Sequence, residues 1–151
     1  MVTYLDTSVL LAHLLDEERQ PPETLWEGAV VSSRLAEYEV WTRVHREGLG
    51  TSHADSTRAL LGRLAFLELT PTILGRALEP FPHPVRTLDA LHLATVEFLR
   101  SKHQPVRLAT YDERQRAVAI RLGLDLFPLS AAPAVDQRRG RAPRRPRRAG
   151  P

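Results

Sequence analysis

Four acidic residues lie far apart in this 151-residue chain, and each stands in a short, mainly apolar context. They are Asp6, Glu39, Asp89 and Asp112. If the fold gathers these carboxylates, they raise one another's pKa and repel, so the cluster is stable only around a cation. Carboxylate oxygens select hard divalent ions such as Mg²⁺ or Mn²⁺. Because ions held in this way usually act on phosphates, the pattern predicts metal-assisted phosphate chemistry.

Each of these residues also has an ordinary structural role when taken singly. Asp6 and Asp112 come between an expected strand and an expected helix, where aspartate caps free backbone N–H groups. Asp89 falls in the first turn of a helix, which the helix dipole favours, and Glu39 lies mid-helix, where glutamate commonly faces solvent. The functional interpretation therefore depends on the four residues occurring together.

The elements that would position these residues alternate along the sequence. Apolar runs predict strands at 2–5, 28–31, 66–69, 107–110 and 124–127. Helical patterns lie between the strands, at 7–15, 33–47, 51–65, from 71, from 87 and at 112–122. This alternation is typical of a parallel sheet in an α/β fold. Ligands of such folds bind at the carboxyl ends of the strands, and Asp6 and Asp112 leave the sheet there.

Four stretches of the sequence carry a family resemblance. They read YLDTSVLLAHLL, VVSSRLAEYEVWTRV, RTLDALHLATVEFL and LATYDERQRAVAIRLGL. In order and spacing they resemble PIN-domain proteins, and more narrowly VapC-type ribonuclease toxins; TLDALHLAT is the most specific match. The resemblance covers residues 1–130 and implies a PIN-like, three-layer α/β/α nuclease domain with a central parallel sheet of four to five strands.

The resemblance implies a metal-dependent endoribonuclease that hydrolyses RNA phosphodiester bonds and acts as the toxin of a toxin–antitoxin pair. The family's acidic positions fall on Asp6, Glu39, Asp89 and Asp112, which would be both the metal ligands and the catalytic residues. The expected cofactor is Mg²⁺, with Mn²⁺ as the alternative. The expected partners are an RNA substrate, a cognate antitoxin protein and a second copy of the chain in a homodimer.

Two of the acidic assignments have neighbours that compete for them. Glu37 and Glu39 both border apolar faces of the same expected helix, so periodicity does not choose between them. Matching the family pattern from Ser33 favours Glu39. Asp112 is followed directly by Glu113, which could share its role.

Hydroxyl groups and one histidine lie close to these acids in the sequence. Thr7, Ser8 and Thr110 either orient the carboxylates or cap helices and end strands. His92 stands on an expected apolar stripe of the helix that begins at Thr87, together with Leu88, Leu91, Thr95, Phe98 and Leu99. We expect it to be a satisfied core histidine, with a hydrogen bond to Asp89 as the alternative.

The net charge of +3 hides two parts of opposite sign. Residues 138–151 contain seven arginines and no acid, so residues 1–137 carry 14 basic against 18 acidic side chains, a net charge of −4. Residues 131–151 are rich in arginine and proline, and residues 138–151 contain no large apolar side chain, which predicts a disordered basic tail. The tail is either a neutral extension or an arm that binds phosphates. A non-catalytic PIN-like module that binds nucleic acid through this tail is the alternative function.

Other classes of site lack their sequence patterns. The chain has no cysteine, no HExxH spacing, no phosphate-binding G-x-x-x-x-G-K-[ST] loop and no G-x-S-x-G elbow. A phosphotransfer receiver or a haloacid-dehalogenase-like phosphatase would also place aspartate after the first strand. The first would need a lysine after a strand, but Lys102 lies in an expected helix, and the second would need aspartate where Ser8 stands. With no signal peptide or membrane-length apolar run, we expect a cytoplasmic protein.

Overall fold

A computed structural model describes residues 1–129 of the chain, and the expected basic tail at 131–151 lies outside these residues. The described part contains a five-stranded sheet in the order β3-β2-β1-β4-β5, and every neighbouring pair of strands is parallel. The strands are β1 (Val2–Leu5), β2 (Val30–Ser33), β3 (Ala65–Leu67), β4 (Val106–Ala109) and β5 (Asp125–Leu126). The expected parallel α/β fold is confirmed.

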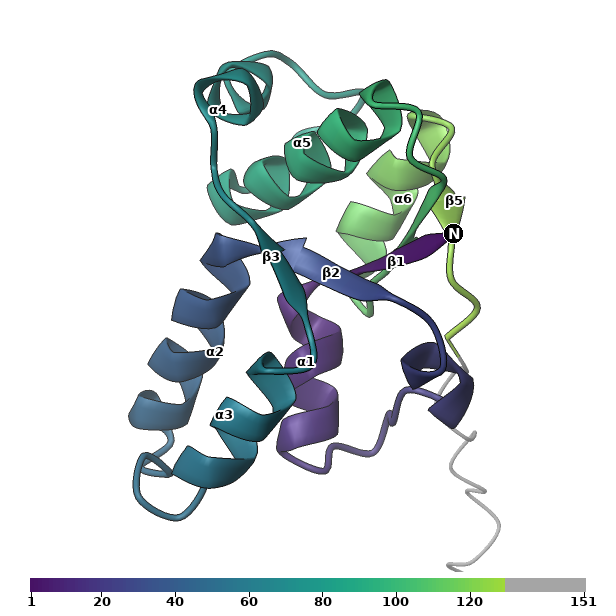
Figure 1. The fold of residues 1–151 in the computed structure, drawn as a ribbon. Coiled ribbons are helices and arrows are strands. Elements are labelled where there is room, and N and C mark those ends of the chain that lie inside the picture. Colours follow the sequence, from purple (N-terminus) through teal and green to yellow (C-terminus); the bar gives the residue numbers. More distant parts are fainter. Residues whose placement is uncertain (130–151) are drawn as a thin grey trace, which may run out of the picture.

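Helices cover both faces of this sheet (Figure 1). On one face lie α1 (Thr7–Leu14), α2 (Arg34–Arg46) and α3 (Ala54–Leu61), with a short 3-10 helix η1 (Glu23–Trp26) beside them. On the other lie α5 (Thr87–Ser101) and α6 (Glu113–Arg121), and α4 (Pro71–Ala77) packs against α5. Within the described residues, none of the helices is long and apolar enough to cross a membrane.

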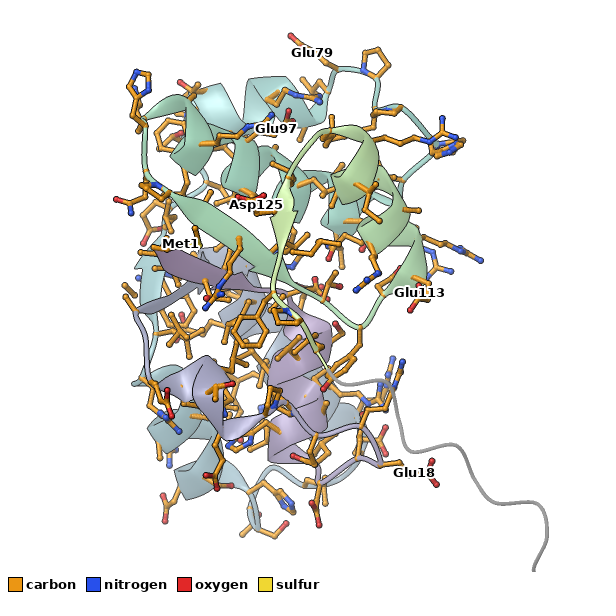
Figure 2. All side chains as sticks on the ribbon, turned by 90° about the vertical axis from the view of Figure 1, so that its right-hand side faces the viewer. Met1, Glu18, Glu79, Glu97, Glu113 and Asp125 are labelled. Carbon is orange, nitrogen blue, oxygen red and sulfur yellow. The ribbon has the colours of Figure 1, made fainter. Side chains whose placement is uncertain are left out.

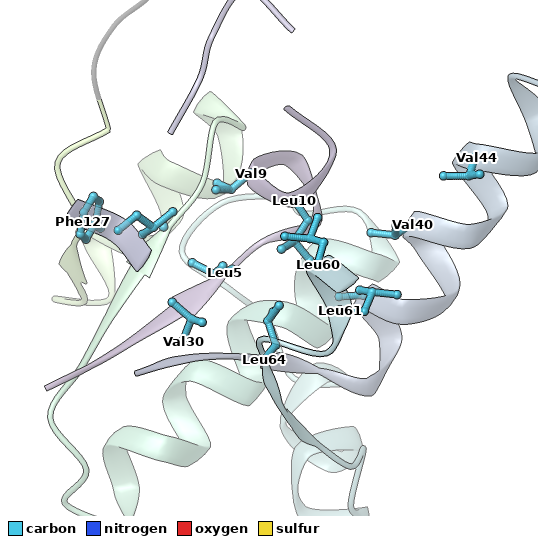
Figure 3. Close-up of a cluster of buried hydrophobic side chains, with 13 residues drawn as sticks. Leu5, Val9, Leu10, Val30, Val40, Val44, Leu60, Leu61, Leu64 and Phe127 are labelled. Carbon is cyan, nitrogen blue, oxygen red and sulfur yellow. The ribbon is translucent and has the colours of Figure 1, made fainter. Parts of the chain in front are cut away.

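Two apolar cores result from the alternation of side chains along the strands. Leu5 and Val30 pack with the first helical layer, in the cluster that Figure 3 shows. Their neighbours Tyr4 and Val31 point the other way and pack with α5 and α6. The sheet is covered on both faces, as parallel sheets usually are, although its strands include polar residues such as Thr3, Ser32 and Arg107.

The element boundaries differ most from the sequence prediction in residues 51–69, which form α3 and β3. Residues 51–65 were expected to be one helix, but α3 spans only Ala54–Leu61 and Gly62 caps its end. The turn that follows returns the chain to the sheet, where Ala65 pairs with Val31. This pairing moves β3 forward from the expected 66–69. The reason is tertiary, since the position of β2 sets where β3 can begin.

The single apolar stripe expected on α5 is wrong. Leu88 is exposed, whereas the buried residues occupy two sides of the helix. They are Ala90, His92, Leu93, Ala94, Thr95 and Val96. Because α5 lies between the sheet and α4, it buries more of its surface than a helix at the edge of the molecule.

Candidate active site

Asp6 and Asp112 leave two neighbouring strands at the same edge of the sheet. β1 and β4 are parallel and pair Leu5 with Ala109, so the residues after them emerge side by side. Asp6 is the N-cap of α1, and Asp112 is the N-cap of α6. The structure therefore places both predicted residues at the carboxyl ends of the strands, where α/β folds bind ligands.

Glu39 and Asp89 approach this edge from helices on opposite faces of the sheet. Glu39, on α2, accepts a hydrogen bond at 2.6 Å from the hydroxyl of Thr7, the residue after Asp6. Asp89, in the first turn of α5, is partly buried, and burial raises the pKa of its carboxyl. The negative charges of Asp112 and Asp6 raise this pKa further. The structure thus brings all four predicted acids to one region.

Asp6 is the most firmly held of the four, with 6% of its surface exposed. Its Oδ2 accepts hydrogen bonds from the backbone N–H and the hydroxyl of Ser8 and, at 3.3 Å, from the hydroxyl of Thr110. Its Oδ1 accepts one at 3.1 Å from the side-chain amide of Gln115. Two of the three hydroxyls named from the sequence, those of Ser8 and Thr110, therefore hold this carboxylate in place.

Asp112 combines the cap role with a place in the acidic cluster. Its Oδ1 accepts hydrogen bonds from the backbone N–H groups of Arg114 at 2.8 Å and Gln115 at 3.0 Å. Neither bond uses Oδ2. Glu113 is exposed, and Figure 2 shows it at the outer side of α6, pointing away from the body of the molecule.

The structure separates Glu37 from Glu39. Glu37 forms an ion pair with Arg34, 2.9 Å apart, on the partly exposed side of α2. Glu39 instead points to the carboxyl edge, with 20% of its side chain exposed and two hydrogen bonds to buried groups. Of the two glutamates, Glu39 is the one beside Asp6.

Sequence reasoning did not find the partners of His92. The expected alternative, a hydrogen bond to Asp89, is not the contact that the structure forms. His92 is 1% exposed; its Nε2 lies 2.6 Å from Glu39 Oε2 and its Nδ1 lies 2.7 Å from the Tyr4 hydroxyl. Burial alone would lower the pKa of His92, but Tyr4, Glu39 and the nearby Asp6 outweigh burial and raise it well above the usual value.

The donor chemistry of this cluster fits a hard divalent cation. Asp112 Oδ2, Glu39 Oε1 and both oxygens of Asp89 receive no hydrogen bond from residues 1–129, so these oxygens remain available as ligands. The side-chain oxygen of Gln115 is also buried beside Asp6 without a partner in this part of the chain. A cation would relieve the repulsion that raises the pKa of Asp89.

The described residues do not form a complete metal cage. No three carboxylate or imidazole groups within residues 1–129 are close enough together to hold an ion by themselves. A small divalent ion that keeps several water ligands needs only one or two protein carboxylates. The cluster therefore fits a partly hydrated ion rather than one enclosed by protein.

A comparison with protein-family models places this chain, with its acidic cluster, in a known family. The PIN-domain model matches residues 3–121, which is most of the chain and includes all four acids. The chain belongs to the PIN-domain family.

Two relatives of this PIN-domain protein are the ribonucleases VapC46 and VapC47 of Mycobacterium tuberculosis. VapC46 is 38% identical over 94 residues, or 62% of this chain and 69% of the relative. VapC47 is 31% identical over 118 residues, or 74% of this chain and 85% of the relative.

Solved structures support the same fold at lower sequence identity. One is the Mycobacterium tuberculosis toxin VapC20, which cleaves the sarcin–ricin loop; its TM-score is 0.57 at 20% identity, over 76% of this chain and 93% of that one. Another is VapBC2 of Rickettsia felis bound to a fragment of its promoter DNA. Its TM-score is 0.55 at 14% identity, over 84% of this chain and 98% of that one. This PIN-domain protein is therefore VapC-like in sequence and PIN-like in fold.

Proposed function

We propose that this PIN-domain protein is an endoribonuclease that hydrolyses RNA phosphodiester bonds and acts as the toxin of a toxin–antitoxin pair. One observation carries the proposal. Asp6, Glu39, Asp89 and Asp112 come from four separate segments of a VapC-like chain and meet at one edge of the sheet. A protein that only binds nucleic acid would gain nothing from gathering four acids, because they repel phosphate.

The acidic cluster would hold a partly hydrated Mg²⁺, with Mn²⁺ as the alternative ion. PIN-domain ribonucleases generally use a divalent metal, and the oxygen donors of this site suit either ion. A bound divalent ion neutralises the phosphate and lowers the pKa of water. Asp6 and Asp89 would be its main anchors, with Asp112 beside them and water in the remaining positions, which leaves Oε1 of Glu39 free.

The chain's own residues would orient the reactants. Ser8 and Gln115 keep Asp6 in a fixed position, and Thr7 and His92 do the same for Glu39. The free oxygen of Glu39, Oε1, would accept the proton that the attacking water loses. The water oxygen would bond to phosphorus as the bond from phosphorus to the 3′-oxygen breaks. The released 3′-oxygen would take a proton from solvent water, which leaves a 5′-phosphate and a 3′-hydroxyl.

The partners follow from the same proposal. VapBC2 names a toxin together with its antitoxin, and we expect this chain likewise to bind a cognate antitoxin that blocks the site. RNA is the substrate, and the cytoplasm is where toxin, antitoxin and RNA would meet.

We further propose a homodimer formed through α4. Leu78, at the end of this helix, is 89% exposed, and Leu74 is exposed beside it. They border a mainly apolar groove of about 700 Å³ that also includes Phe81 and Leu91. A two-fold contact needs a self-complementary patch, and here each copy offers both a projecting leucine and a groove to receive one. Exposed apolar patches of this kind often mark interaction sites.

Cleavage of a labelled total-RNA pool by the purified full chain tests the proposed activity. Wild type and Asp89→Asn are compared with Mg²⁺, with Mn²⁺ and with EDTA. We expect cutting that needs the metal, stops in EDTA and is lost in Asp89→Asn. Equal cutting by both proteins would show that the acidic cluster is not the active site, and absence of cutting with either ion would contradict the nuclease assignment.

A further inference from the structure

His92 lies inside a closed set of contacts that joins three elements. Its Nδ1 is 2.7 Å from the hydroxyl of Tyr4 on β1, and that hydroxyl accepts the backbone N–H of Ser33 at 3.1 Å. Ser33 is the N-cap of α2, the helix that carries Glu39. Glu39 in turn contacts Nε2 of His92 at 2.6 Å, which closes the set. The ring is therefore fixed at both nitrogens.

The direction of the last hydrogen bond is decided by chemistry. An ionised carboxylate has no proton to donate, so Nε2 of His92 carries the hydrogen in its contact with Glu39. The hydroxyl of Thr7 donates to the same oxygen, Oε2, also at 2.6 Å. With two donors on Oε2, only Oε1 of Glu39 remains for a cation or for the substrate.

This arrangement differs from that of a histidine that only fills space. A core histidine needs one partner for its buried N–H group, whereas His92 joins a strand hydroxyl to the one carboxylate of the cluster that a flexible side chain carries. Glutamate has three rotatable bonds, so without a partner its carboxylate would occupy several positions. Holding it in one position before substrate arrives removes that disorder from the reaction.

We propose that His92 is a positioning residue for RNA cleavage, which holds Oε2 of Glu39 through Nε2 and presents Oε1 to the reaction, while Tyr4 and Ser33 fix the plane of the ring. This inference rests on the proposed ribonuclease function and assigns a residue outside the four acids to it. Substitution of a residue that holds a metal ligand or catalytic group in place typically lowers activity or metal affinity by about 10- to 100-fold.

Two substitutions of nearly equal size separate positioning from packing. The amide nitrogen of glutamine reaches about the position of Nε2, whereas that of asparagine reaches only about the position of Nδ1. His92→Gln can therefore still donate to Glu39, and His92→Asn cannot. We expect kcat to fall about 10- to 100-fold in His92→Asn with KM changed less than about twofold, and to recover to within about fivefold of wild type in His92→Gln.

A second measurement does not depend on cleavage. In proton NMR of the metal-free full chain with ¹⁵N-labelled histidine, the buried Nε2–H of His92 should resonate far downfield, as short hydrogen bonds to carboxylate cause. The signal should disappear in His92→Asn and move upfield in Glu39→Gln. The wild-type signal reports the contact between His92 and Glu39 directly, so this measurement still tests the contact if a variant unfolds during the kinetic assay.

The outcomes distinguish the inference from the function on which it rests. If His92→Asn cleaves RNA like wild type while Asp89→Asn is inactive, or if the NMR signal is unchanged in Glu39→Gln, the positioning role is wrong and the nuclease stands. Equal losses of activity in His92→Asn and His92→Gln would likewise mean packing alone. If wild type shows no metal-dependent cleavage although the signal is present, the proposed function is wrong instead.

Discussion

In Glu39 and Asp112, one oxygen accepts all of the hydrogen bonds and the other is left for a ligand. Asp6 uses both of its oxygens, with three donors on Oδ2 and the Gln115 amide on Oδ1. Asp89 differs, because nothing in residues 1–129 donates to it, and burial together with Asp112 and Asp6 raises its pKa by more than His92 and Arg86 lower it. Its charge is therefore the one that most needs a cation.

Asp89→Asn should stabilise the metal-free protein although it removes activity. The pKa of Asp89 is raised in the folded state by burial and by Asp112 and Asp6, so the folded protein binds this proton more tightly than the unfolded chain does. The free energy of unfolding therefore falls as pH rises from the usual aspartate value through the raised pKa, and stays lower above it. We expect a gain at neutral pH of no more than about 1 kcal/mol, because the group is only partly buried.

Thermal unfolding in EDTA at several pH values checks this sign. Asp89→Asn should unfold at a higher temperature than wild type at neutral pH. The difference in unfolding temperature should vanish at acid pH, where Asp89 is protonated. A variant less stable than wild type at neutral pH would show that Asp89 is satisfied within the protein. Wild-type affinity for Mn²⁺ should correspondingly fall as pH drops through the raised pKa.

At the level of residues, the sequence pointed to the four acids that the fold brings to one region, but not to the contacts among their partners. The chemistry of Asp6 and Asp89 can be read from their neighbours in the chain. The link between Tyr4, His92 and Glu39 spans as many as 88 residues, and each member also reads as an ordinary strand or helix residue. A local pattern carries no information about which distant side chain a buried hydroxyl or imidazole meets.

Local signals set the start of α4 correctly. The sequence predicted a helix from residue 71, and in the structure Thr70 caps this helix with Pro71 at its first position. The boundaries of α3 and β3 were less accurate, because pairing with β2 rather than local propensity decides where β3 begins. Signals within one turn of chain are thus readable from sequence, whereas register between strands is not.

Thr70→Ala should weaken α4 without affecting the reaction. The Thr70 hydroxyl accepts the backbone N–H of Ile73 at 3.4 Å, and losing a cap costs about 0.5–1 kcal/mol at such a long distance. Thr72→Ala is the matched control, since Thr72 is exposed within the same helix. Urea unfolding should show the loss in Thr70→Ala only, with RNA cleavage by both variants equal to wild type. A loss of cleavage in Thr70→Ala would mean that α4 takes part in the reaction.

At the scale of the whole molecule, the acidic residues 1–137 and the basic residues 138–151 have opposite electrostatic effects on RNA. Residues 1–137 carry a net charge of −4, which opposes RNA approach, and the seven arginines that follow can offset it. A truncation after Ala134 should therefore keep metal-dependent cleavage but raise KM. The dependence of RNA affinity on salt should also weaken, by up to about 5 in the log–log slope for seven phosphate contacts on a single strand.

Filter binding across a salt series and steady-state cleavage measure these effects. The same truncation decides the alternative function. Loss of all RNA-dependent activity on truncation, with Asp89→Asn behaving like wild type, would favour a module that binds nucleic acid through its tail.

The proposed dimer can be tested on the same scale. Leu78→Glu places a charge on the exposed end of α4 and should convert the dimer to a monomer in light scattering. Ile120→Glu is the control, because Ile120 is also exposed but lies on α6. A dimer that persists in Leu78→Glu, or dissociates in Ile120→Glu, would place the interface elsewhere.

The most direct test of the central claim compares two glutamates on one helix. Glu39 belongs to the acidic cluster, and Glu37 pairs with Arg34 at the surface. Single-turnover RNA cleavage with saturating Mn²⁺ should be at least about 100-fold slower in Glu39→Gln, as expected for loss of a proton acceptor at the reacting centre. In Glu37→Gln it should stay within about twofold of wild type. Equal rates in the two variants, or a larger loss in Glu37→Gln, would contradict the account.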